Sequence, residues 1–267
     1  KKLANKIVKG LNAQLHILSV VETPSEILVT DEGELQGGMS SETKGLISEK
    51  QEAIRKLEGW KQNLPVSTKS SVLFGELLYT IKHYIKNNNI DLVIMGTHGV
   101  TGLKEKFSGS VTQQVILNNR VPVLSLKCDR GDVDFSDFLI TGDFESKEVM
   151  DFGVLKALQK VFNSKMHLLC VSTKSKFKST ANALEKMKGF AAINELENVE
   201  FHIHNDVSEE EGILNFSNNY DANHELNIDI VAVEKKDKST LEHWFTGCAA
   251  IDYVNHIYRP IITYLTK

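Results

Sequence analysis

Four glycines and a serine within 15 residues are the part of this sequence best suited to chemistry: Gly96, Gly99, Gly102, Gly109 and Ser110. Glycine has no Cβ atom, so neighbouring backbone N–H groups can point into one concavity. Unpaired N–H groups and the dipole at a helix N-terminus both favour an anion. The spacing therefore predicts a phosphate-binding loop. The alternative is a glycine-rich turn that holds no ligand.

The elements around these glycines are those that would hold such a loop in place. Residues 90–95 form a short apolar, β-branched run, which is typical of a strand buried on both faces of a parallel sheet. A helix is expected from Gly109 or Ser110 to about Asn118, with Ser110 or Ser108 as its N-cap. The loop would then face a helix N-terminus at the end of a buried strand.

The wider pattern resembles the nucleotide-binding signature of the ATP-binding universal stress proteins. The glycine spacing, the pair Gly102-Leu103 and the closing Val-Pro-Val-Leu run at 121–124 all fit that family. The resemblance implies ATP as the ligand, with Mg²⁺ as an optional companion. AMP, another adenine nucleotide, a cyclic nucleotide or a small metabolite are alternatives. Carried over by position, the residues implied to hold the nucleotide are Val20, Met95, Gly96, Gly99, Gly109, Ser110 and Val111.

A second copy of the same unit follows the first. Residues 11–20 match residues 162–171 at an offset of 151, and residues 89–95 match residues 227–233 at an offset of 138. Each copy consists of alternating strand and helix patterns. Such alternation requires a parallel sheet with right-handed crossovers.

The expected fold class is therefore α/β, with two tandem flavodoxin-like domains of the adenine nucleotide alpha hydrolase type, each a doubly wound parallel sheet. The domains are expected at 1–128 and 134–267, with a polar linker at 129–132. The family resemblance implies an intramolecular pseudo-dimer in which the last strands, 121–127 and 261–265, pair. Pairing would protect two apolar sheet edges from aggregation. A further homodimer of two chains stays open.

The individual elements follow from the same patterns. The expected strands are 15–21, 66–73, 90–95, 121–127, 138–141, 166–171, 199–204, 228–234 and 261–265. The expected helices are 1–10, 41–63, 76–87, 110–118, 147–162, 178–196, 209–218 and 249–257.

The first copy lacks a counterpart for one strand of the second. In the second copy the expected first strand ends at Gly142 and Asp143, 28 residues before Val171. The same interval before Val20 falls upstream of Lys1, so we expect this strand to exist in the native protein outside the present sequence. In nucleotide-binding relatives the end of this strand supplies an aspartate to the adenine. The present sequence contains no residue of the first copy that could make this contact with adenine.

The second copy departs from the glycine pattern. Glu234, Asp237 and Thr240 stand where the first copy has its first three glycines, and Cys248 stands where it has Ser110. Two carboxylates at a phosphate loop oppose an anion by Coulomb repulsion. We therefore expect this copy not to bind ATP and to serve a structural or regulatory role.

Other chemistry is weakly indicated. His98 lies inside the glycine loop and could approach a phosphate, or simply be solvated. His202 and His204 share one strand face, a spacing that metals can use, but no further ligand stands nearby in sequence, so no metal site is predicted. His16 and His167 recur at matching positions, which favours a shared packing or hydrogen-bonding role. The sequence has no GxxxxGK[ST], HExxH or GxSxG motif, and no catalytic residue is predicted.

Composition sets further bounds. The chain has 267 residues, net charge −4 and three widely spaced cysteines, as expected for two domains in a reducing compartment. No basic stripe suits nucleic acid, and no apolar run is long enough for a membrane helix. No secretory leader is visible, so the expected location is the cytoplasm.

Two functions follow from these observations. The first is an ATP-binding stress or signalling module with one working site in the first copy. Because no general base or metal-holding acid is evident, it would be at most a slow ATPase. The second is a nucleotide-free interaction scaffold that retains an unused glycine loop.

Overall fold

The computed structural model describes residues 2–38, 40–62, 64–65, 67–96, 111–126, 134–219, 226–235 and 259–266. The chain divides into two compact units, Lys1–Ile90 and Asp91–Lys267. The glycine loop at 97–110, the linker at 129–132 and the helix expected at 249–257 lie outside the described residues.

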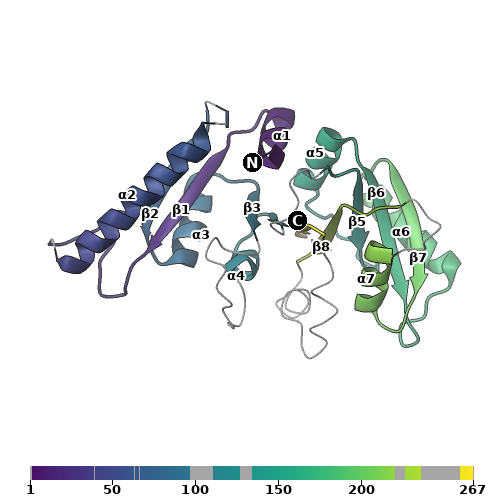
Figure 1. The fold of residues 1–267 in the computed structure, drawn as a ribbon. Coiled ribbons are helices and arrows are strands. Elements are labelled where there is room, and N and C mark those ends of the chain that lie inside the picture. Colours follow the sequence, from purple (N-terminus) through teal and green to yellow (C-terminus); the bar gives the residue numbers. More distant parts are fainter. Residues whose placement is uncertain are drawn as a thin grey trace. The chain divides into compact units, whose positions relative to one another are not determined.

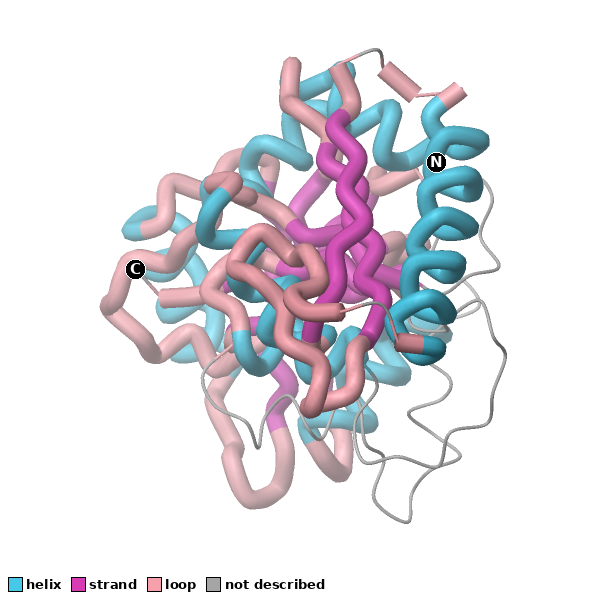
Figure 2. Tube along the Cα trace, turned by 90° about the vertical axis from the view of Figure 1, so that its left-hand side faces the viewer, coloured by secondary structure: helices cyan, strands magenta, loops and turns pink. Residues whose placement is uncertain are grey.

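The first unit is a two-stranded parallel sheet with helices packed on it. Its elements are α1 (Lys2–Leu11), β1 (His16–Glu22), α2 (Ser41–Lys61), β2 (Lys69–Gly75) and α3 (Leu77–Asn87). Figure 2, in which this unit faces the viewer, shows the two strands side by side with α2 running along them. Leu57 of α2 packs against Val21, Val72 and Phe74 of the strands, and these four side chains form one buried hydrophobic cluster of the unit.

The second unit contains a seven-stranded sheet in the order β3-β4-β9-β8-β5-β6-β7. Its strands are β3 (Val93–Gly96), β4 (Val123–Leu126), β5 (Asp137–Thr141), β6 (Lys165–Ser172), β7 (Val199–Asn205), β8 (Ile230–Glu234) and β9 (Ile261–Tyr264). Its helices are α4 (Val111–Asn118), α5 (Gly153–Phe162), α6 (Thr180–Ile193) and α7 (Glu209–Asn219) (Figure 1). Every neighbouring pair is parallel except β4 and β9.

Strand pairing reflects the internal repeat. In the second copy the order is β7-β6-β5-β8-β9, with β5 between β6 and β8. The first copy has the corresponding pairs β2-β1 and β3-β4, which belong to different sheets. The boundary between units thus differs from the boundary between copies, because β4 pairs with β9 and draws the end of the first copy into the larger sheet.

The central strands of the larger sheet are buried on both faces. Leu139 and Ile140 of β5, and Ile230, Val231 and Ala232 of β8, are all fully buried. These strands are apolar along almost their whole length because helices cover both faces of a parallel sheet. Among the described residues, no helix has both the length and the apolar character to cross a membrane.

One helix boundary predicted from sequence is wrong. The helix expected to start at residue 147 begins at Gly153. Met150 instead forms an antiparallel bridge with Thr266, and its N–H donates to Asn194 Oδ1 at 2.7 Å. Asp151 N–H donates to the carbonyl of Leu265 at 2.7 Å. These distant partners hold the segment out of the helix.

Candidate functional site

Of the predicted nucleotide loop, the structure describes the two flanks, which are the end of β3 and the start of α4. The strand ends at Gly96, and its carbonyl accepts a hydrogen bond from Thr112 Oγ1 at 2.8 Å. Thr112 is the second residue of α4 and is buried, whereas Val111, the first residue, is exposed. The first turn of α4 has no acidic side chain. The bond therefore ties the first described turn of α4, which has no acidic side chain, to the end of β3.

The structure places four of the seven predicted residues. Met95 and Gly96 end β3, and Val111 begins α4, so these three lie at one junction. Val20 lies in β1 of the other unit, partly buried and opposite Leu73 of β2. The remaining predicted residues, outside the described part of the chain, are Gly99, Gly109 and Ser110.

Thr112 is a structural residue of this junction that sequence reasoning missed. Its hydroxyl donates to the carbonyl of Gly96, which lies 16 positions earlier in the sequence. A threonine in the first turn of a predicted helix is the available sequence signal. This signal points to a bond with Gly96 only once the structure shows that β3 ends beside Thr112.

The second copy carries a carboxylate at the corresponding strand end. Glu234 is the last residue of β8, and its Oε1 accepts a hydrogen bond from Thr266 Oγ1 at 3.3 Å. Tyr264 pairs with Glu234 and is buried. Burial, followed by the charges of Glu234 and Asp143, raises the pKa of Tyr264, so this phenol stays neutral. An anion would meet a negative charge at this strand end.

A polar cavity of about 550 Å³ lies beyond the ends of β5 and β6 in the second copy. Glu145 lies between two cations, 2.8 Å from Lys186 Nζ and 3.2 Å from Lys178 Nζ. Hydrogen bonds from Lys186 and then Lys178 lower the pKa of Glu145 to about 2. Lys178 also donates to the carbonyl of Asp143 at 3.1 Å. Asp143, which the repeat places at the end of the first strand of this copy, thus follows β5 and lines the cavity beside these lysines.

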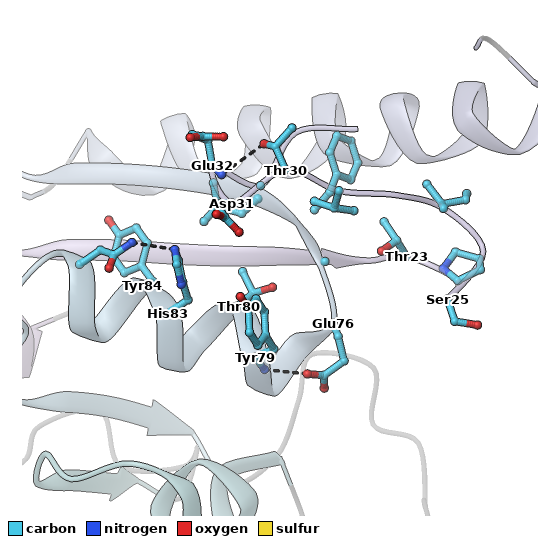
Figure 3. Close-up of a pocket in the computed structure, with 18 of the residues that line it drawn as sticks. Thr23, Ser25, Thr30, Asp31, Glu32, Glu76, Tyr79, Thr80, His83 and Tyr84 are labelled. Atoms are coloured by element: carbon cyan, nitrogen blue, oxygen red, sulfur yellow. Dashed lines mark hydrogen bonds between the residues drawn. The ribbon is translucent and has the colours of Figure 1, made fainter. Parts of the chain in front are cut away.

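The first unit contains a cavity of about 530 Å³ that the sequence did not predict (Figure 3). The loop that follows β1 lines one side, including Asp31 and Glu32, and α3 lines the other, including His83. Glu76 accepts hydrogen bonds from Leu78 N–H at 3.0 Å and Tyr79 N–H at 2.7 Å. Its carboxylate thus serves as the N-cap of α3.

The parallel order β7-β6-β5-β8-β9, with α5, α6 and α7 as crossovers, defines a doubly wound α/β protein. A solved universal stress protein from Archaeoglobus fulgidus shares this fold, with a TM-score of 0.59 at 17% identity, covering 98% of this chain and 92% of its own.

Sequence comparison then gives the family. The universal stress protein family model matches residues 2–127. The universal stress protein MJ0531 of Methanocaldococcus jannaschii is 32% identical over 126 residues, 47% of this chain and 72% of that protein. A second protein of the same organism, universal stress protein MJ0577, is 36% identical over 90 residues, 33% of this chain and 54% of its own. The chain belongs to the universal stress protein family.

Proposed function

We propose that this chain is a tandem universal stress protein that binds ATP, or a related adenine nucleotide, in its first copy and acts in stress response or signalling. The observation that carries the proposal is the β3–α4 junction. Gly96 ends a strand, Thr112 holds the helix start beside it, and no acidic side chain occupies the first turn. The glycines at 99 and 109 lie between these points in sequence. Backbone N–H groups there would hold the phosphates.

The two copies differ in the charges that a bound phosphate would meet. A phosphate group at the first junction would meet N–H groups and the positive end of α4. At the second it would meet Glu234, whose carboxylate is held in place by Thr266. We assign the second copy a structural role, in which pairing of β4 with β9 joins the copies as a pseudo-dimer.

Calorimetry with ATP and AMP on the full chain tests the proposal. Gly99→Asp and Gly109→Glu would each place a carboxylate in the loop and should weaken ATP binding by roughly tenfold or more, since one unfavourable charge contact costs about 1.4 kcal/mol or more. Glu234→Gln, a charge change of the same size in the second copy, is the matched control and should leave the affinity unchanged.

Two results would overturn the proposal. Unchanged ATP affinity in both glycine variants would place the nucleotide elsewhere. Absence of binding to the unaltered chain at millimolar ATP and AMP would favour the nucleotide-free scaffold.

A further inference from the structure

Three neighbouring strands of the second copy bring a group of ionisable side chains together. Asp137 lies on β5, His167 on β6, and Glu200 and His202 on β7, strands that lie side by side in Figure 1. The register pairs His167 with Glu200, and residues two apart on a strand share a face. Phe216 of α7 lies over this face, with its ring 5.0 Å from that of His202.

The distances within this group are those of a potential metal site. His167 Nδ1 lies 2.9 Å from His202 Nε2 and 3.9 Å from Glu200 Oε2. The three ligand atoms lie within 4.8 Å of one another. In a tetrahedral site with bonds of about 2.0–2.1 Å, ligand atoms are separated by about 3.3 Å. The two ring nitrogens would have to separate by about 0.4 Å, and Glu200 Oε2 would have to approach His167 Nδ1 by about 0.6 Å.

Asp137 determines which nitrogen of His167 is available. The imidazole Nε2 lies 2.8 Å from Asp137 Oδ1, so Nε2–H donates to the carboxylate and Nδ1 keeps its lone pair. Without a cation, His202 Nε2–H donates to that lone pair; to bind a metal through Nε2, the neutral His202 ring would carry its proton on Nδ1 instead. A carboxylate that orients a ligating histidine is the usual outer partner at zinc sites.

The first copy provides an internal comparison. His16 occupies the position of His167, but Lys69 stands opposite it, where the second copy has Glu200. The position of His202 is taken by Ser71, which bonds Tyr84. The ring of His16 contacts Tyr84 OH and Gln14 instead. The repeated histidine thus acquires the other ligands in the second copy alone.

We propose that His167 Nδ1, His202 Nε2 and the Glu200 carboxylate bind a divalent transition-metal ion, with Zn²⁺ the best match and water as the fourth ligand. Two imidazoles and one carboxylate form a set that zinc accepts, whereas Mg²⁺ prefers oxygen ligands. Glu200 is half exposed at the edge strand β7, so the ion can arrive from solvent. The site is separate from the proposed nucleotide loop and does not depend on it.

Lys165 competes for the same carboxylate. Its Nζ lies 3.2 Å from Glu200 Oε2, and both side chains are about half exposed. An exposed ion pair of this kind contributes little stability, so a metal ion can displace it. The nearby positive charge nevertheless opposes a cation. Removal of this charge should therefore strengthen metal binding.

Zn²⁺ calorimetry on the full chain, freed of any polyhistidine tag and treated with a chelator, tests the site. We expect His202→Ala and Glu200→Gln to weaken binding by at least about tenfold, and Asp137→Asn by roughly 10–100-fold through loss of the outer partner. Lys165→Gln should increase the affinity several-fold, a gain that unfolding cannot produce. His204→Ala, the other histidine of the His-x-His pair, should leave the affinity unchanged.

The proposal fails on any of three results. The first is that the unaltered chain binds Zn²⁺ no more tightly than the His202→Ala variant does. Another is an equal loss in His204→Ala, which would indicate a different ligand set. The third is weaker binding in Lys165→Gln while circular dichroism shows the fold unchanged.

Discussion

Substitution of Thr263 by valine tests the contact between the last strands of the two copies. Val123 N–H on β4 donates to Thr263 Oγ1 on β9 at 3.0 Å. Val123 is 0% exposed and Thr263 is 2% exposed, so water cannot replace the lost acceptor. A buried donor left without its partner costs about 1–3 kcal/mol, and we expect Thr263→Val to lower the free energy of unfolding by about 2 kcal/mol. That corresponds to roughly a 30-fold shift in the unfolding equilibrium.

Urea unfolding followed by far-UV circular dichroism measures this change, with Thr263→Ser as the control. Serine keeps the accepting oxygen and loses one buried methyl group, at a cost of about 1 kcal/mol. The valine variant should therefore be the less stable of the two. Equal stability of Thr263→Val and the unaltered chain, or a serine variant less stable than the valine variant, would refute the role assigned to this hydrogen bond.

Two further predictions concern other parts of the chain. Hydrogen bonds from Lys186 and Lys178 lower the pKa of Glu145 from about 4.5 to about 2, so this carboxylate stabilises the fold above pH 4.5 and loses that effect as the pH falls towards 2. Glu145→Gln should therefore flatten the acid limb of a stability–pH curve, and an unchanged limb would contradict this. Gly33→Ala should lower stability by about 2 kcal/mol, because φ is +75° and the added Cβ would lie 2.7 Å from a leucine side chain of β2. Gly37→Ala, also at positive φ but in open space, should cost less in thermal unfolding; equal costs would remove the steric argument.

Much of the fold could be predicted because its signals are local. The runs at 138–141 and 166–171 became the buried strands β5 and β6, since a strand covered on both faces is apolar throughout. The glycine spacing after residue 95 led to the universal stress protein family, which the family match confirms. The start of α5 could not be predicted in the same way. Met150 belongs to a bridge with Thr266, 116 residues away, and such pairing leaves no periodic pattern nearby.

Residue types at short or constant spacing were enough to predict the repeat, the α/β class and the family. The candidate metal site required the tertiary structure. His202 and His204 are visible as a pair in sequence, yet the structure groups His202 with Glu200 and His167 and orients His167 with Asp137. Which side chains meet across three strands depends on the register of their backbone hydrogen bonds. That register is set by packing of the whole sheet, and no single segment contains it.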